Sequence, residues 1–265
     1  MTRHPAFDAD RWLDALPGRR SRRAFDGVPV SGANLDAIEA TAAGFRPFDD
    51  TRVVVVREVP QAFFTGIIGS YGRVTGAPSA LVFIADDSSP ASAEHCGYTG
   101  EGIVLEANAR GLATCWIAGS FSRSAVAAAI ALAPHEVVRA ISPVGHAMAE
   151  PTTAERRLFG ATKPKRRRSL DEIAPGHERW PAWAVAGLNA ARIAPSAMNR
   201  QPWRFRMEDG AVIVATAGPS VPLAPARLDC GIAILHFELG ARGEGCDGAW
   251  EPLAGRDVAR WVPLA

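Results

Sequence analysis

Two long apolar segments, each followed by a glycine, constrain the fold of this chain more than any other feature. The first predicts a helix over 101–110 that ends at Gly111. The second predicts a helix over 230–241 that ends at Gly243. Their shared ending is the first sign of a repeated unit.

The repeat extends beyond the two glycines. Residues 106–111 follow the pattern Glu-x-x-Ala-Arg-Gly, and residues 238–243 follow the same pattern. Each apolar segment also comes after a unit of helix and then strand, over 35–58 and 183–217. These observations indicate an internal duplication with an intact first copy and an abbreviated second copy. The alternative is that Ala-Arg-Gly recurs by chance in a chain rich in those residues.

Hydrophobic periodicity predicts further helices and strands around these segments. Helices are expected over 9–17, 35–43, 122–132 and 183–193, and strands over 51–58, 80–86, 138–145, 203–208 and 211–217. Segment 80–86 is apolar enough to be covered on both faces. Asp209-Gly210 marks a hairpin. Residues 113–117 fit a turn or a short strand, and 150–179 is expected to be a connection rich in Pro, Arg and Lys.

Length and charge limit the class of protein. The 265 residues allow one large domain or two small ones, and the 48% of hydrophobic residues argue against a disordered chain. Lys and Arg number 29 against 28 Asp and Glu, so the overall charge favours neither nucleic acid nor any other charged partner. Any basic function must come from local clusters.

We expect a cytoplasmic protein with no membrane association. The first residues have no apolar core that would serve as a secretory signal. No segment carries the roughly 20 apolar residues that span a bilayer. The four cysteines lie far apart without a C-x-x-C pair, which favours reduced thiols over a disulfide framework or a zinc site.

Several common catalytic signatures are missing from the sequence. It contains no G-x-x-x-x-G-K-[ST] phosphate loop, no G-x-G-x-x-G after a strand and no G-x-S-x-G elbow. Its six histidines form no H-x-x-x-H pair. Nothing therefore indicates a metal site or a serine hydrolase.

Three polar segments remain as candidate sites. Arg19-Arg20-Ser21-Arg22-Arg23 offers guanidinium groups and a hydroxyl to an anion, unless it is simply a solvated basic turn. In an extended segment Arg19, Ser21 and Arg23 would face the same way. Residues 194–205 join a helix to a strand and contain small residues, Pro and Asn, which suits either close approach of a planar ligand or a helix-capping turn. Residues 163–168 are basic, which fits an exposed linker better than a nucleic-acid patch.

Together, three motifs resemble those of the FMN-dependent nitroreductase superfamily. They are R-R-S-x-R over 19–23, G-L-A-T-C-W-I-x-G over 111–119, and A-P-S-x-x-N-x-Q-P-W-R-F over 194–205. The resemblance covers most of the chain. It implies an α+β fold with mixed sheets flanked by helices, and FMN bound where two subunits of a homodimer meet.

The order of the motifs departs from that family. Its typical members carry the A-P-S-x-x-N loop a few dozen residues after the arginine-rich arm, but here residues 40–48 fill that place without the Ser and Asn. The intact loop follows a whole first repeat. The resemblance therefore implies two fused repeats that form an intramolecular pseudo-dimer, 1–178 with the arm and 179–265 with the loop, in one compact unit. We expect a monomer that binds one FMN.

The resemblance also implies which residues bind the cofactor. The arm would supply Arg19 to the FMN phosphate, Ser21 to ribityl or phosphate oxygens, Arg23 to the ring near N1 and O2, and Arg20 as a further phosphate contact. Backbone N–H groups of Ala118 and Gly119 would reach N5 and O4. Lys165 and Arg167 align with a basic tail that contacts the phosphate. The loop residues Pro195, Ser196, Ala197 and Asn199 would lie beside the ring and ribityl chain, with Gln201-Pro202-Trp203 as an anchor.

The implied activity is hydride transfer from NADH or NADPH, through FMN, to a nitro compound, quinone or other small electron acceptor. The flavin performs the chemistry, so no catalytic side chain and no metal are required. A flavin-binding or storage protein with little turnover is the main alternative. A nucleic-acid partner that uses residues 163–168 is a weaker one.

Overall fold

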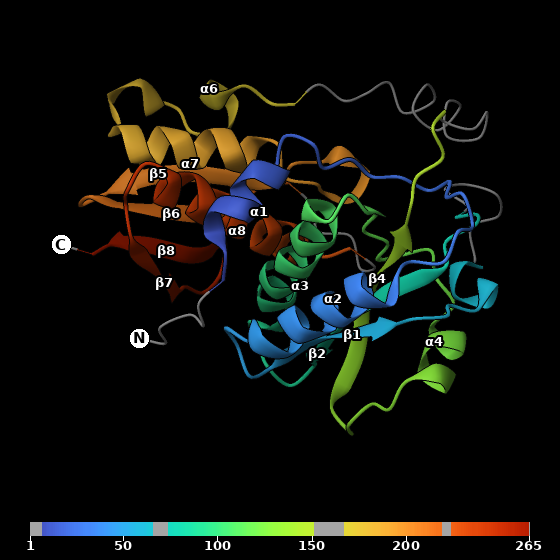
Figure 1. Ribbon diagram of the computed structural model, residues 1–265. Helices are drawn as coiled ribbons and strands as arrows, with labels where there is room; N and C mark the ends of the chain where they lie inside the picture. Colours follow the sequence, from blue (N-terminus) through green and yellow to red (C-terminus); the bar gives the residue numbers. More distant parts are fainter. Residues whose placement is uncertain (1–6, 66–73, 151–166, 219–223, 265) are drawn as a thin grey trace.

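The computed structural model describes residues 7–65, 74–150, 167–218 and 224–264. Within them, two four-stranded antiparallel sheets lie on opposite sides of a pair of long helices (Figure 1). The α+β fold with helix-flanked sheets is thereby confirmed. The strand pairings inside both sheets are antiparallel.

Each half of the chain builds one sheet. A short helix, α1 (Ala9–Ala15), comes first. The first half then contains α2 (Gly32–Gly44), β1 (Thr51–Val56), the 3₁₀ turn η1 (Gln61–Phe64), β2 (Ser79–Asp86), α3 (Ser92–Ala109), β3 (Ala113–Thr114), α4 (Arg123–Ala129) and β4 (Glu136–Gly145). Helix α6 (Leu170–Ile173) lies in the connection between the halves. The second half then contains α7 (Ala182–Arg192), β5 (Trp203–Glu208), β6 (Ala211–Thr216), α8 (Ala226–Gly243), β7 (Gly248–Pro252) and β8 (Asp257–Pro263).

The two halves repeat one topology. In each, a helix and two strands precede an 18-residue helix, and two more strands follow it. The strand orders are β1-β2-β4-β3 and β5-β6-β8-β7, so corresponding strands occupy corresponding places. Both sheets even carry a register shift between their second and fourth strands. This repeated order agrees with the duplication that the sequence indicates.

The sequence match that suggested the repeat is out of register by two residues. Helix α8 runs through Gly243, and the glycine in the left-handed conformation after it is Gly245, with φ +76°. Gly111, after α3, also has φ +76°. The structural counterpart of Gly111 is therefore Gly245. Helix α8 does end at Gly243, as predicted, but Gly243 is the last residue of the helix and the left-handed position lies two residues later.

Helices α3 and α8 cross at one glycine from each half. A Cβ atom on Gly97 would lie 2.1 Å from the carbonyl oxygen of Leu228, and one on Gly231 would lie 2.0 Å from that of Glu94. Each opposing carbonyl belongs to the residue three positions before the partner glycine, so the contact is symmetric. Only glycine permits this approach of two helix backbones.

The close crossing also explains why α3 begins earlier than expected. Its first half, 92–100, contains glycines and polar residues that mask the helical pattern in the sequence. Gly100 leaves room for the rings of Trp116 and Phe83, and Gly102 leaves room for those of Trp12 and Phe45. Tertiary packing thus outweighs the low helix propensity of glycine here.

Other boundaries differ from the predictions for local reasons. The strands β7 and β8 were not predicted, and they complete the second sheet through pairs such as Trp250 with Trp261. Helix α6 lies inside the expected connection, where Ser169 and Glu172 form a capping box. Helix α4 ends at Ala129, before the predicted end, because Ile130 is extended.

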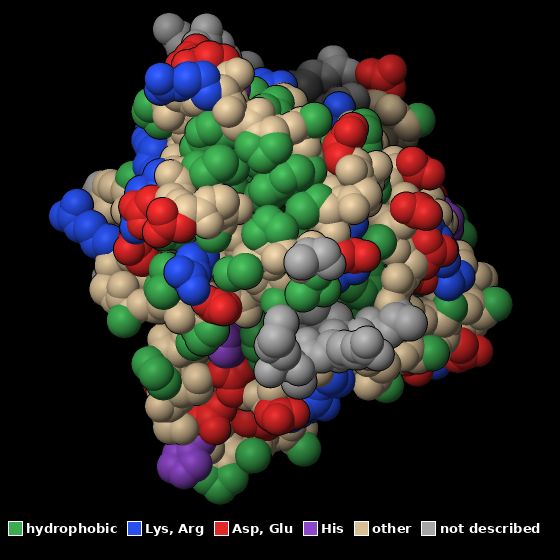
Figure 2. All heavy atoms as spheres, turned by 90° about the vertical axis from the view of Figure 1, so that its left-hand side faces the viewer, with side chains coloured by type: hydrophobic (Ala, Val, Ile, Leu, Met, Phe, Trp, Pro, Cys, Tyr) green, Lys and Arg blue, Asp and Glu red, His purple; other side chains and the backbone are tan. Residues whose placement is uncertain are grey.

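The first sheet is covered on both faces, as the apolar run in 80–86 predicts. Leu81 and Phe83 of β2 join the main core with α3, whereas Val82 and Ile84 join a second cluster beneath η1 and α4. Within the described part of the chain, the second sheet contributes side chains to the main core from its inner face only. Figure 2 shows that end of the molecule, where hydrophobic side chains in the middle are ringed by charged ones.

No helix in the described part of the chain combines the length and the apolar character needed to cross a membrane.

The helix crossing can be tested by Gly231→Ala. The new Cβ would meet a backbone oxygen that cannot move without separating α3 from α8. We expect the free energy of unfolding to fall by about 1–3 kcal/mol, as measured by chemical denaturation. Gly32→Ala at the start of α2, where nothing lies within 4 Å, is the control and should change it by less than about 0.5 kcal/mol. Equal stability of Gly231→Ala and the wild type would contradict this account of the crossing.

Candidate functional site

The arm, residues 19–23, runs along the edge of the first sheet. Ser21 forms a parallel bridge with Thr114 of β3, and the N–H of Arg22 donates to the carbonyl of Thr114 at 2.9 Å. The segment after β3 continues to Ala118 and Gly119, both half-buried. Two of the three motifs therefore lie side by side.

Arg19 is a buried cation whose head group has a free nitrogen. Its side chain is 6% exposed, and Nη1 has no hydrogen-bond partner among the described residues. Burial lowers the pKa of Arg19, while the nearby charge of Glu101 opposes that shift. A buried guanidinium with an unpaired donor is costly unless an anion completes it. Arg19 therefore fits an anionic ligand such as a phosphate.

The loop between α7 and β5 has an unusual backbone. Met198, Asn199 and Gln201 all have φ of 52°, a left-handed conformation that non-glycine residues seldom adopt. The side chain of Gln201 donates to the carbonyl of Asn199, and its N–H donates to Oγ of Ser196 at 2.9 Å. Gln201 and Trp203 are both buried, as expected for the anchor of this loop. Such strain persists only where the surroundings enforce it, and it is concentrated at functional sites.

Asp229, in the first turn of α8, holds this loop in place. Its Oδ1 accepts from the N–H of Ala197 at 3.1 Å, and its Oδ2 accepts from the guanidinium of Arg200 at 3.1 Å. Burial raises the pKa of Asp229 to about 6, although both partners act against that shift.

Arg167 is hydrogen-bonded to the loop and is affected by the charges of the arm. Its guanidinium donates to the carbonyl of Ala194 and to Oδ1 of Asn199. Its pKa is lowered to about 10, first by burial and then by the charges of Arg19, Arg192 and Arg20. Cations from the arm, the end of α7 and the basic tail thus gather at one place, where an anion would relieve their repulsion.

The other predicted site residues lie in the loop, in the arm or outside the described part of the chain. Pro195 is buried, and Ser196 and Ala197 are half-buried, in the loop just described. Arg23 is half-buried beyond the bridge to β3. Lys165 lies outside the described residues.

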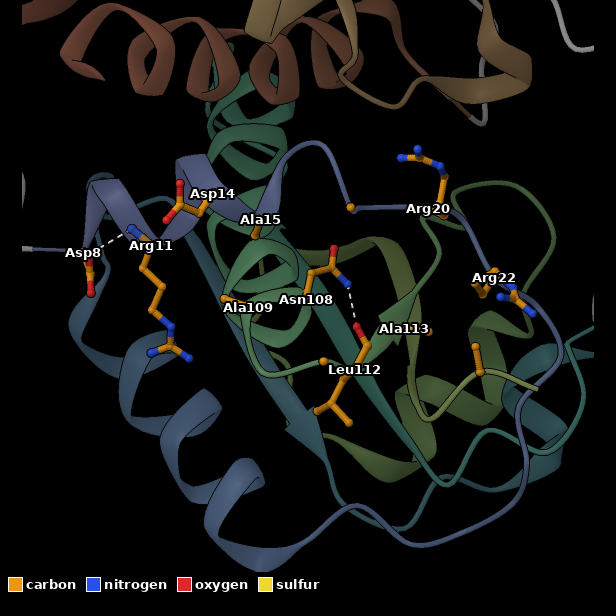
Figure 3. Close-up of a pocket in the computed structure, with 13 residues that line it drawn as sticks. Asp8, Arg11, Asp14, Ala15, Arg20, Arg22, Asn108, Ala109, Leu112 and Ala113 are labelled. Atoms are coloured by element: carbon orange, nitrogen blue, oxygen red, sulfur yellow. Dashed lines mark hydrogen bonds between the residues drawn. The ribbon is translucent and has the colours of Figure 1, made fainter. Parts of the chain in front are cut away.

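Arg20 and Arg22 line a hollow on another side of the arm (Figure 3). The hollow has a volume of about 730 Å³ and lies between α1, the arm and the end of α3. Its charges are mixed, because Asp8, Asp14 and Arg11 also line it. One guanidinium nitrogen of Arg20 donates to the carbonyls of Pro17 and Arg19, so Arg20 is committed to the backbone more than Arg19 is.

In the first half, aromatic residues occupy the loop that corresponds to 194–201. Phe48 stacks on His95 with ring centroids 3.7 Å apart, and Phe45 is buried against Trp12. His95 contacts Asp50 of this loop at 2.9 Å, as Asp229 contacts Ala197 in the second half. His95 lies two residues before Gly97, and Asp229 lies two residues before Gly231. The same position of the long helix therefore contacts the corresponding loop in each half.

Sequence reasoning missed three buried polar residues of this region. They are Glu101, Asp229 and His236, and all lie in the two long helices. The available signal was a polar side chain inside an otherwise apolar helix, because such a group must find a partner when it is buried.

The hold of Asp229 on the loop can be tested by pH. Because its pKa rises from 3.8 to about 6 on folding, the folded state binds the proton more tightly. Its contribution to stability is full below pH 4 and is lost as pH rises through 6. We expect the free energy of unfolding of the wild type, relative to Asp229→Asn, to fall by on the order of 2 kcal/mol between pH 4 and pH 7. A constant difference across that range would show that this carboxyl does not titrate as described.

Comparisons with known proteins agree with this geometry. The sequence model of the family described as "Putative TM nitroreductase" matches residues 12–241. A putative nitroreductase from Thermotoga maritima is 21% identical in sequence and superposes with a TM-score of 0.59. The match covers 98% of this chain and 95% of that one. That similarity extends over both halves. No curated protein matches the chain.

Smaller nitroreductases match only about half of the chain. An FMN-dependent nitroreductase from Clostridium difficile is 21% identical, covers 52% of this chain and 88% of its own, and has a TM-score of 0.43. A nitroreductase with bound FMN from Bacteroides fragilis is 17% identical, covers 56% and 95%, and has a TM-score of 0.40. The match of the family model over most of the chain is the one that identifies it: this protein belongs to the nitroreductase family.

Proposed function

We propose that this protein is an FMN-dependent oxidoreductase that takes hydride from NADH or NADPH and passes it to a nitro compound, quinone or other small acceptor. The observation that carries the proposal is the buried Nη1 of Arg19, which has no partner among the described residues, together with the charge of Arg19 acting on Arg167. Such a cluster suits the near-double negative charge of the FMN phosphate.

The arm and the basic tail would bind the phosphate end. Arg19 is the main phosphate ligand, with Arg167 and Lys165 as further cations and Arg20 as a weaker contact. Ser21 would bond ribityl or phosphate oxygens. Arg23 would lie near N1 and O2 of the ring, where a cation favours the reduced flavin and raises its potential.

The loop of the second half and the segment after β3 would hold the ring. Pro195, Ser196, Ala197 and Asn199 supply small groups and an amide in a backbone that Asp229 and Gln201 keep in shape. Ala118 and Gly119 would offer backbone N–H groups to N5 and O4. When bound, FMN supplies the hydride transfer, so these residues need only orient the ring and its partners.

The fused halves favour a single site in a monomer. The first half, residues 1–178, provides the arm and the segment after β3, and the second half, residues 179–265, provides the loop. The opposite combination lacks an arginine-rich arm, and aromatic residues fill its loop.

Anaerobic mixing tests the activity. Purified yellow protein is mixed with NADH or NADPH in the absence of oxygen, and the flavin absorbance is followed. Rapid bleaching, followed by return of the colour on adding a quinone or a nitro compound, is expected. A flavin that binds but stays oxidised with both donors would favour the alternative, a flavin-storage protein with little turnover.

Arg19→Ala tests the phosphate site. Loss of one charged hydrogen-bond partner costs about 1.5–3 kcal/mol, so FMN affinity should fall about 10- to 150-fold by fluorescence titration. Arg57→Ala is the matched control, because Arg57 is exposed and pairs with Glu39 and Asp36 away from the arm. Full flavin content in purified Arg19→Ala would refute the assignment of the arm.

The pseudo-dimer predicts one FMN per chain in a monomer. Flavin absorbance after denaturation, set against protein concentration, should give a ratio near one. Light scattering should give a mass near 28 kDa. A ratio near two would mean that the aromatic loop of the first half also binds flavin, and an obligate dimer would mean that a second chain completes the site.

A further inference from the structure

A buried hydrogen-bond chain joins the core of the second half to the segment after β3. His236 of α8 contacts the carbonyl of Ala190 through Nδ1 at 3.2 Å and Glu101 of α3 through Nε2 at 2.8 Å. The indole Nε1 of Trp116 donates to the other oxygen of Glu101 at 2.6 Å. Glu101 and His236 are both 0% exposed.

The donors and acceptors along these hydrogen bonds determine the net charge of the Glu101–His236 pair. A carbonyl oxygen only accepts, so Nδ1 of His236 must carry a hydrogen. One further proton then lies between Nε2 and Oε1 of Glu101, on either atom. In both cases the pair of side chains has no net charge, which is how two ionisable groups can be fully buried.

Contacts with Phe83, Gly100 and Glu101 restrict the side chain of Trp116. Its ring stacks on Phe83 with centroids 4.1 Å apart, and a Cβ on Gly100 would lie 2.6 Å from its outermost carbon. The bond from Nε1 to Glu101 fixes the remaining rotation. Trp116 lies two residues before Ala118 and two after Thr114, which bridges to the arm at Ser21. Together with the antiparallel bridge between Ile117 and Ile141, its orientation therefore constrains the path of the segment that faces the proposed ring.

We propose that Glu101, anchored by His236 of the other half, is a positioning residue that fixes Trp116 and with it the FMN-facing segment 117–119. This inference rests on the proposed function. The charge of Glu101 also opposes the effect of burial on the pKa of Arg19, so this hydrogen-bond chain is electrostatically linked to the proposed phosphate site.

The test compares two substitutions at Glu101. Glu101→Leu keeps the approximate volume but leaves Trp116 Nε1 and His236 Nε2 without partners, so FMN affinity should fall about tenfold or more. Glu101→Gln can accept from Trp116 and donate to His236, so affinity should stay within about threefold of the wild type. The indole N–H resonance of Trp116 in tryptophan-labelled apoprotein should move in Glu101→Leu.

Glu238→Leu is the matched control. Glu238 is also 0% exposed and also accepts from an indole, that of Trp250, but it lies away from the arm. It should lose stability as Glu101→Leu does while the folded protein keeps its FMN affinity. If Glu101→Leu does not fold, Trp116→Phe keeps an aromatic ring for stacking on Phe83 but removes the donor and the outer carbon beside Gly100, and it should weaken FMN binding in the same direction.

The outcomes separate this inference from the proposed function. Wild-type protein that binds no FMN would overturn both. Wild-type affinity in Glu101→Leu or Trp116→Phe, a tenfold loss in Glu101→Gln, or an equal loss in Glu238→Leu would overturn only the positioning role.

Discussion

The rest of the structure depends on the contact between the backbones of α3 and α8. At Gly97 and Gly231 the two helices approach so closely that no side chain fits between them. This contact places the two halves about a local pseudo-symmetry axis. It also fixes the positions two residues earlier, where His95 and Asp229 each hold the loop of their own half. The geometry of the candidate site is therefore a consequence of helix packing in the core.

On this symmetric scaffold, different residues make the two ends unlike. In the second half Asp229 secures a loop of small residues with three left-handed backbone positions. In the first half, the ring of Phe48 packs on His95 and fills the equivalent place. The arginine-rich arm is likewise present once. The two halves therefore share one topology but differ in the residues of these corresponding loops.

The sequence predicts those parts of the fold whose signals lie within a few neighbouring residues, and it misses those that depend on distant contacts. The apolar run of β2 and the glycine after α3 were read correctly because their signals are confined to a few residues. The start of α3 was missed, since its glycines serve contacts with α8 and with the ring of Trp116 that no local pattern reveals. The same holds for β7 and β8, which form through pairing with distant strands.

The candidate site divides in the same way. The arm and the loop were recognised by their motifs, but the groups that hold them were not. Asp229 holds Ala197, which lies 32 residues earlier in the same half, and Glu101 contacts His236 of the other half, 135 residues away. Only the three-dimensional structure brings such pairs together.

A crystal structure of the protein grown with FMN would test the central claim most directly. The account predicts one flavin per chain, with its phosphate on the guanidinium of Arg19 and its ring between Gly119 and the loop at Asn199. A flavin bound elsewhere, or one whose ring is enclosed by the loop of a second molecule, would contradict it.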